Sequence, residues 1–205
     1  MLTKINDRIS YIKATPDPLS ADIGIVTGDT KIFIFDVGAN PEPLSELNTV
    51  LLNNPDKLPV FVLSHFHSDH TGNIVNIDFP NIYGGQETIK HIKKGTVVAA
   101  PLAFSDGVEI KIFPIPSSHA KGCVGMSIDD EFAFMGDAAY SAEKDNKQIY
   151  NKNLLKDEIE FLKTLPAKKL LLSHKERFIY PKNVIIRQLE SVYANASKDD
   201  MYIYI

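Results

Sequence analysis

Four short apolar segments of the chain each lead into a histidine or an aspartate, and this regularity constrains the fold more than any other feature. The run VFVLS leads into His65, IKIFPIPSS into His119, FAFMG into Asp137 and KLLLS into His174. Short apolar runs of this kind are typical of buried strands. Loops at strand ends can converge on one edge of a rigid scaffold, where sites are commonly built. The sequence therefore predicts a sheet edge at which several ligand-type side chains meet.

The densest group of such side chains lies in residues 64–71, which read SHFHSDHT, in a chain with 6 histidines altogether. In an extended segment alternate side chains project to the same side, so His65 and His67 can face one cation while Phe66 packs away. Asp69 and His70 follow where we expect the chain to turn toward a helix, and they would face a neighbouring position. Imidazole nitrogens and carboxylate oxygens suit zinc and similar divalent ions.

A purely structural explanation of this group is less satisfactory. An isolated histidine is usually a hydrogen-bonded residue without a ligand role, and we interpret His91 in that way. Burying four polar side chains together without a metal would leave several of them without partners, which costs free energy. An exposed polar loop disagrees with the apolar strand that precedes the group. We therefore predict metal binding.

The pattern resembles the H-x-H-x-D-H signature of the metallo-β-lactamase superfamily, and the resemblance extends over most of the chain. The turn Asp36-Val37-Gly38 after IFIF matches the early aspartate motif of that family. The later motifs match at His119 in SSHAKG, Asp137 in FMGDA and His174 in LLSHK.

The resemblance implies an α/β fold, the four-layer αβ/βα sandwich, in which two packed mixed sheets carry helices on their outer faces. We expect one such domain over residues 1–205. The resemblance also implies a site with two divalent metal ions, of which Zn²⁺ is the expected kind and Fe or Mn the alternatives. It assigns His65, His67 and His119 to the first ion, Asp69, His70 and His174 to the second, Asp137 to both together with a bridging hydroxide, and Asp36 to a position behind the ligands that orients them.

Details of the motifs narrow the subgroup within that family. A carboxylate at Asp137, where zinc β-lactamases carry cysteine, resembles glyoxalase II and the lactonases. His67 differs from the glutamate of the flavodiiron proteins. The chain leaves no room for the C-terminal domain of glyoxalase II, and it lacks an obvious exosite like that of the tRNA-processing nucleases. The resemblance thus implies a compact hydrolase in which a metal-bridging hydroxide, positioned by Asp69, attacks the carbonyl of an ester, thioester, lactone or amide.

Three other functions remain open from the sequence. A persulfide dioxygenase-like oxidoreductase with one iron would use a subset of the same ligands. A metallo-phosphodiesterase or nuclease would apply the same two-ion chemistry to phosphorus. A noncatalytic metal-binding protein would keep the ligands without the reaction.

Composition limits the partners. The chain of 205 residues has a formal net charge of −4, which gives no reason to expect nucleic acid or an anionic membrane. Its single cysteine allows no intrachain disulfide and fits a reducing compartment. The N-terminus lacks the continuous apolar stretch of a signal peptide. We expect a cytoplasmic protein that acts on a small molecule.

The remaining pattern predicts strands in RISYIKA, ADIGIVTG, TKIFIFDVG, LPVFVLS, VEIKIFPIP, CVGMSID, EFAFMGD and KKLLLS. Helical spacing indicates helices after Pro41, from Glu87 to Lys93, from Leu154 to Leu165, and from about Pro181 to Ala196. We interpret Tyr140 as a packed or surface residue, Lys121 and Lys175 as solvated lysines at the rim of the site, and Cys123 as a small buried hydrophobic residue.

Overall fold

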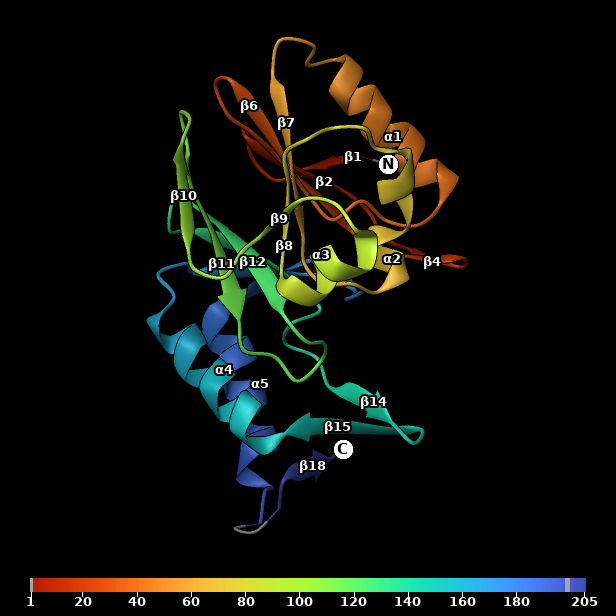
Figure 1. The fold of residues 1–205 in the computed structure, drawn as a ribbon. Coiled ribbons are helices and arrows are strands. Elements are labelled where there is room, and N and C mark those ends of the chain that lie inside the picture. The colour runs from red at the N-terminus through yellow and green to blue at the C-terminus, as the bar shows by residue number, and fades with distance from the viewer. Residues whose placement is uncertain (1, 198–199) are drawn as a thin grey trace.

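The computed structural model describes residues 2–197 and 200–205 and contains two large mixed sheets packed face to face (Figure 1). The first sheet has seven strands in the order β1-β2-β5-β6-β7-β8-β9. Its strands are β1 (Leu2–Lys4), β2 (Ile9–Ile12), β5 (Ile23–Thr27), β6 (Lys31–Phe35), β7 (Leu58–Leu63), β8 (Ile82–Gly84) and β9 (Thr96–Val97). Strands β1, β2, β5 and β6 pair antiparallel, whereas β6 to β9 run parallel.

The second sheet has six strands in the order β10-β11-β12-β13-β16-β17. Its strands are β10 (Leu102–Ser105), β11 (Glu109–Ile115), β12 (Cys123–Ile128), β13 (Phe132–Gly136), β16 (Lys169–Leu172) and β17 (Ile179–Pro181). Only β13 and β16 form a parallel pair in this sheet.

Helices cover the outer faces of both sheets. They are α1 (Pro41–Leu52), α2 (Ser68–Thr71), the 3-10 helix η1 (Gly72–Asn76), α3 (Gln86–Ile92), α4 (Lys152–Thr164) and α5 (Lys182–Ala194). Helix α1 lies on the first sheet, and α4 and α5 lie beyond the second (Figure 1). This arrangement confirms the predicted four-layer αβ/βα sandwich.

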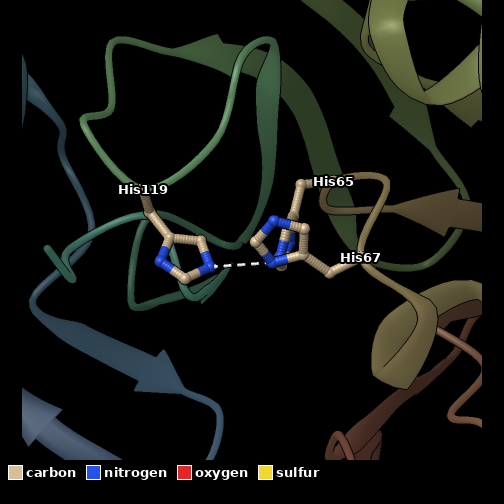
Figure 2. Close-up of side chains that lie close together, drawn as sticks. All are labelled: His65, His67 and His119. Carbon is tan, nitrogen blue, oxygen red and sulfur yellow. Dashed lines mark hydrogen bonds between the residues drawn. The ribbon is translucent and has the colours of Figure 1, made fainter. Parts of the chain in front are cut away.

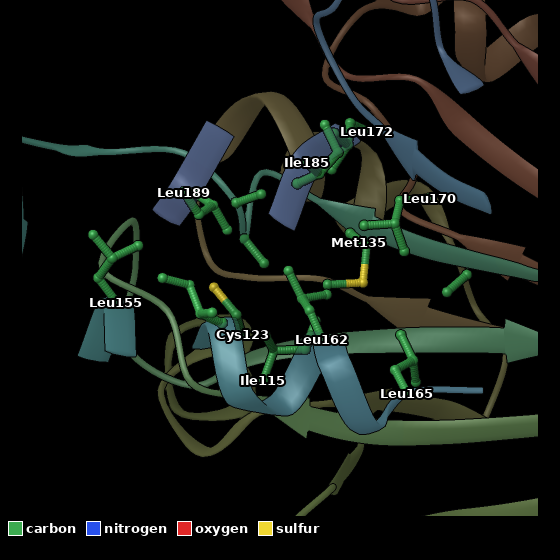
Figure 3. Close-up of a cluster of buried hydrophobic side chains, with 14 of the residues drawn as sticks. Ile115, Cys123, Met135, Leu155, Leu162, Leu165, Leu170, Leu172, Ile185 and Leu189 are labelled. Atoms are coloured by element: carbon green, nitrogen blue, oxygen red, sulfur yellow. The ribbon is translucent and has the colours of Figure 1, made fainter. Parts of the chain in front are cut away.

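Three apolar clusters hold the layers together. Between the sheets, Phe35 of one stacks on Phe134 of the other with ring centroids 5.4 Å apart. Leu47 of α1 packs on Ile34 and its neighbours in the first sheet. Leu162 of α4 and the inward residues of α5 pack on the second sheet (Figure 3). Strands covered on both faces must be apolar at successive positions, which explains the continuous apolar runs in the sequence.

Local signals explain where the predicted helices begin. The side chain of Asn151 accepts hydrogen bonds from the backbone N–H groups of Asn153 and Leu154, each at 3.1 Å, and so caps α4. Proline occupies the first turn of α1, where its missing N–H has no partner to lose. All four predicted helices and all eight predicted strands are present, although α5 begins after Pro181, which ends β17.

Two small sheets escaped prediction. One is a hairpin of β3 (Thr15–Pro16) and β4 (Leu19–Ser20). The other has three strands, β14 (Ala142–Lys144), β15 (Lys147–Asn151) and β18 (Tyr202–Tyr204). In it, β18 near residue 205 pairs with β15, about 50 positions earlier. None of the helices in residues 2–197 and 200–205 is long and apolar enough to cross a bilayer.

Candidate metal centre

The site lies where the carboxyl ends of parallel strands from both sheets meet. In the first sheet, β6 leads into Asp36 and β7 into His65; in the second, β13 leads into Asp137 and β16 into His174. The two sheets are joined at this edge, because the backbone N–H of Val124 donates to the carbonyl of Ser64 at 2.8 Å. The strand order thus brings residues more than 100 positions apart to one place.

Gly136 permits this close approach of the sheets. Its φ is +54°, in the left-handed region that favours glycine, and a Cβ atom there would lie 2.7 Å from Cβ and Oγ of Ser64. Any larger residue would push the Ser64–His65 segment away from Asp137.

The first ligand group consists of His65, His67 and His119 (Figure 2). One ring nitrogen from each lies within 4.8 Å of the others. Nε2 of His119 is 3.2 Å from Nδ1 of His67, while the other nitrogen of His119, Nδ1, lies 3.0 Å from the carbonyl oxygen of Ser141. That carbonyl can only accept, so it holds the His119 proton on Nδ1 and leaves the Nε2 lone pair facing the group.

The second ligand group consists of Asp69, His70, Asp137 and His174. Nε2 of His174 is 2.9 Å from Oδ2 of Asp69 and 3.3 Å from Nε2 of His70. Asp69 and His70 belong to α2, so the expected turn into a helix places them on this second group, separate from His65 and His67.

Asp137 lies between the two groups. Its Oδ2 is 3.6 Å from Nε2 of His119 in the first group, and 3.3 Å and 3.7 Å from Nε2 of His70 and His174 in the second. The other oxygen, Oδ1, is buried and has no hydrogen-bond partner among the residues that the structure describes. One carboxylate therefore faces both halves of the site.

Asp36 lies behind the second group. Its Oδ2 is 2.7 Å from Nδ1 of His70 and accepts from Oγ of Ser64 at 2.8 Å, while Oδ1 accepts from the backbone N–H of Ser64 at 2.7 Å. A proton held on Nδ1 leaves Nε2 of His70 as the nitrogen that faces the ligands. His91, in contrast, belongs to α3 and lies outside both groups.

Comparison with known proteins finds solved structures that are similar to this chain. No protein-family model matches the chain, and no curated protein matches it either. A metallo-β-lactamase from Pontibacter korlensis superposes with a TM-score of 0.69 at 20% identity over 96% of this chain and 99% of that one. The metallo-β-lactamase DIM-1 gives a TM-score of 0.71 at 18% identity over 96% and 98%. A flavo di-iron protein from Thermotoga maritima gives 0.66 at 17% identity over 93% and 54%.

The chain has the metallo-β-lactamase fold. At these identities the likeness carries the fold alone, so the chemistry of the site rests on the residues of this chain.

The two ligand groups fit divalent metal ions. Tetrahedral ligands about 2.0–2.1 Å from one zinc ion lie ~3.3–3.4 Å from each other, and the nitrogen pairs His119–His67 and His174–His70 are 3.2 and 3.3 Å apart. Nε2 of His65 is buried without a hydrogen-bond partner among the described residues, as a ligand nitrogen would be. Two facing lone pairs at such distances repel unless a proton or a cation lies between them.

The residues of the two ligand groups differ in how far their pKa values are shifted. Burial, followed by the positive charges of His70 and other histidines, holds the pKa of His65 far below its usual range. Burial also acts against a charge on His70, but the carboxylates of Asp36 and Asp137 outweigh it and raise the His70 pKa to about 10. For Asp69, hydrogen bonding to His174 and the charge of His70 outweigh burial and lower the pKa to about 2. Asp69 is therefore ionised at neutral pH, and the site attracts positive charge.

Two residues around His174 were not assigned to the site from the sequence. Asp22 is buried directly before β5, and its Oδ2 accepts from the backbone N–H of His174 at 3.1 Å. The Tyr140 phenol donates to the carbonyl of Ser173, so Tyr140 is a packed residue, as the sequence predicts. Nothing in the sequence around Asp22 marks it as special, because ADIG is typical of the beginning of an ordinary strand.

The other residues singled out from the sequence have structural or surface positions. Lys175 lies beside a pocket of about 310 Å³ next to His174, with its Nζ 5.4 Å from the Tyr140 ring centre. Lys121 is exposed. Cys123 is buried in the second sheet, and burial raises its pKa to about 12, which makes it a poor nucleophile.

Proposed function

We propose that residues 1–205 form one domain of a metal-dependent hydrolase that acts on the carbonyl group of a small ester, thioester, lactone or amide. The observation that carries the proposal is the position of Asp137 Oδ2, within 3.7 Å of Nε2 of His119, His70 and His174. A carboxylate that faces both ligand groups is the arrangement that a pair of ions could share.

In this proposal each group holds one ion. The first position would use His65, His67 and His119, and the second Asp69, His70, Asp137 and His174. Asp137 would also serve the first position, because its Oδ2 lies 3.6 Å from Nε2 of His119. When bound, two such ions supply a water whose pKa falls from ~15.7 to about 7 and a Lewis acid for the carbonyl oxygen. The nitrogen and oxygen donors favour Zn²⁺, with Fe and Mn as alternatives.

The side chains of the site have separate tasks. Asp69 is ionised and partly exposed, so its carboxylate can accept a hydrogen bond from the attacking water and orient it. Asp36 and the carbonyl of Ser141 fix the proton of His70 and His119 on the nitrogen that faces away. The pocket beside His174, which reaches Thr15 and Leu19 of the β3–β4 hairpin, gives a small substrate access to the second position.

Iron chemistry is the second candidate, because solved structures with the same fold include a chemotaxis sensor described with a peroxy diiron species, at 13% identity and a TM-score of 0.68. A persulfide dioxygenase-like oxidoreductase would hold one iron with part of this ligand set. A metallo-phosphodiesterase would use all of it.

One set of measurements tests the proposal. Elemental analysis of the purified protein gives the kind and number of ions, and a panel of esters, thioesters, lactones, amides, phosphodiesters and glutathione persulfide gives the reaction. We expect two zinc ions per chain and carbonyl hydrolysis. A single iron with persulfide oxidation favours the second candidate, and metal without turnover of any substrate favours a noncatalytic protein.

The variant Asp137→Ala tests the shared carboxylate. We expect it to lower the bound metal and to reduce hydrolysis by two orders of magnitude or more, as the loss of a catalytic contact of ~3 kcal/mol does. Asp78→Ala, at an exposed position, is the matched control and should change neither. Unchanged metal content and unchanged activity in Asp137→Ala would rule out the shared role.

A further inference from the structure

Asp22 connects three segments of the chain through one buried carboxylate. Its Oδ1 accepts from the backbone N–H of Ala14 at 3.0 Å. Its Oδ2 accepts from the backbone N–H of His174 at 3.1 Å and from Oγ of Ser173 at 3.2 Å. The backbone N–H of Asp22 donates to the same Ser173 Oγ at 2.9 Å, which closes the connection from the other side.

The segment that Asp22 holds needs support. His174 has a φ of 62°, a left-handed conformation that costs a residue with a Cβ atom roughly 1–2 kcal/mol. Strand β16 ends at Leu172, so the regular ladder stops before the histidine. Asp22 at the His174 N–H and Tyr140 at the Ser173 carbonyl hold the backbone at this point. Without such contacts the backbone would relax and turn the imidazole.

These contacts reach only one of the two ligand groups. Asp22 contacts the backbone of His174, which belongs to the second group, and the first group is oriented by Ser64 and Ser141 instead. Asp22 also anchors Ala14, next to the β3–β4 hairpin that forms one wall of the pocket beside His174. Its influence on the two metal positions should therefore be unequal.

We propose that Asp22 is a positioning residue for the second metal position: it fixes the backbone of His174 and thereby sets the affinity of that position alone. This inference rests on the proposed two-ion site. Removal of the carboxylate frees the 173–174 backbone, and the ring nitrogen of His174 no longer stays near Asp69 and His70.

The chain offers a matched control in Asp106. This aspartate is buried to the same degree, with 7% of its surface exposed against 6% for Asp22. It also accepts from backbone N–H groups, those of Thr30 and Lys31, at 3.0 and 2.7 Å. Lys31 is the first residue of β6 and Thr30 precedes it, whereas the candidate metal centre lies beyond the other end of that strand. Asp106 therefore binds backbone N–H groups as Asp22 does, but away from the centre.

The test is a stepwise titration of the metal-free full chain with Zn²⁺ and with Co²⁺, for the wild type, Asp22→Ala, Asp22→Asn and Asp106→Asn. In Asp22→Ala we expect the binding step that His174→Ala also loses to fall ten- to a hundred-fold in affinity, the usual effect of losing an outer contact to a ligand. The other step should change less than about twofold, and the Co²⁺ absorption should lose the component of the second ion. Asp106→Asn should lose thermal stability while keeping both binding steps.

Asp22→Asn keeps the shape of the side chain but turns an amide N–H₂ toward at least one backbone N–H. We therefore expect the same binding step to lose affinity, but less than in Asp22→Ala. This variant also serves if Asp22→Ala fails to fold. Equal losses in both steps, or no loss in either, would overturn the role of Asp22 while the two-ion site stands. A wild type that binds fewer than two ions would overturn the proposed function and this inference together.

Discussion

Oδ2 of Asp36 lies 2.7 Å from Nδ1 of His70, and both side chains are almost fully buried. Asp36 has a φ of 63°, so its carboxylate is turned back toward the site by a left-handed turn at the end of β6. The same oxygen also accepts from Ser64, next to His65. One carboxylate thus orients a residue of the second ligand group and the strand end that carries the first.

Replacement of Asp36 by asparagine should weaken metal binding ten- to a hundred-fold, because an amide holds the His70 proton less strongly than a carboxylate does. Asparagine tolerates the left-handed conformation, so the fold should remain. Competition with a chelator measures the affinity. Asp129→Asn is the control, since Asp129 has a φ of 51° and accepts from the Glu109 N–H at 2.8 Å away from the site. Equal affinities for Asp36→Asn and the wild type would contradict the orienting role.

Single histidine replacements should separate the two metal positions. His119→Ala should release the ion of the first group, and His174→Ala that of the second, because each removes one nitrogen from a different set. Elemental analysis after dialysis should then find about one ion per chain in each variant. His91→Ala, outside both sets, should keep the wild-type content. A variant that keeps both ions would remove its histidine from the ligand set.

Much of the site could be predicted because its signals are local. His65, His67, Asp69 and His70 lie within six positions, and His119, Asp137 and His174 each follow an apolar run that forms a buried strand. The pairing of those strands supplied the rest, since parallel neighbours place their carboxyl ends at one edge. The four-layer sandwich was expected from the resemblance to the metallo-β-lactamase superfamily that these motifs carry.

Residues whose role depends on a distant partner could not be found in this way. Asp22 is hydrogen-bonded to Ser173 and His174, some 150 positions later, and nothing near it in the sequence marks that contact. The strand pair β15 and β18 joins Tyr150 to Ile203 in the same manner. Pro181 was expected in a first helical turn, but pairing with Lys169 makes it the last residue of a strand. Tertiary pairing decided these cases.

Loss of the Tyr140 hydroxyl should loosen the His174 segment. In Tyr140→Phe the carbonyl of Ser173 loses a donor, so the free energy of unfolding should fall by about 1 kcal/mol. The affinity of the second metal position should fall several-fold. Tyr180→Phe is the control, because the Tyr180 ring faces Lys175 at 5.5 Å much as the Tyr140 ring does at 5.4 Å. Chemical denaturation and metal titration measure the two effects, and equal results for both variants would contradict the assignment.

Glu158 should make the stability of the protein depend on pH. Its carboxyl group is fully buried on α4, both oxygens lack a hydrogen-bond partner among the described residues, and burial raises its pKa well above the ordinary value of 4.5. Cys123 and Tyr150 are the titratable groups that interact with it, and burial raises the pKa of each to about 12, so both stay neutral near pH 7. The folded protein therefore keeps a proton on Glu158 that the unfolded chain releases.

The sign of the effect follows from that proton. Below pH 4.5 Glu158 is protonated in both states, so it adds no pH dependence. Above pH 4.5 the unfolded chain binds fewer protons than the folded protein. The free energy of unfolding therefore falls as pH rises, by up to about 1.4 kcal/mol per pH unit, until the folded pKa is reached. Glu158→Gln removes this contribution, so its stability relative to the wild type should increase with pH. Urea denaturation between about pH 5 and 8 measures the difference. Glu160→Gln, which changes an exposed partner of Lys163 on the same helix, should run parallel to the wild type. A Glu158→Gln curve that also runs parallel to the wild type would show that Glu158 is ionised in the folded protein.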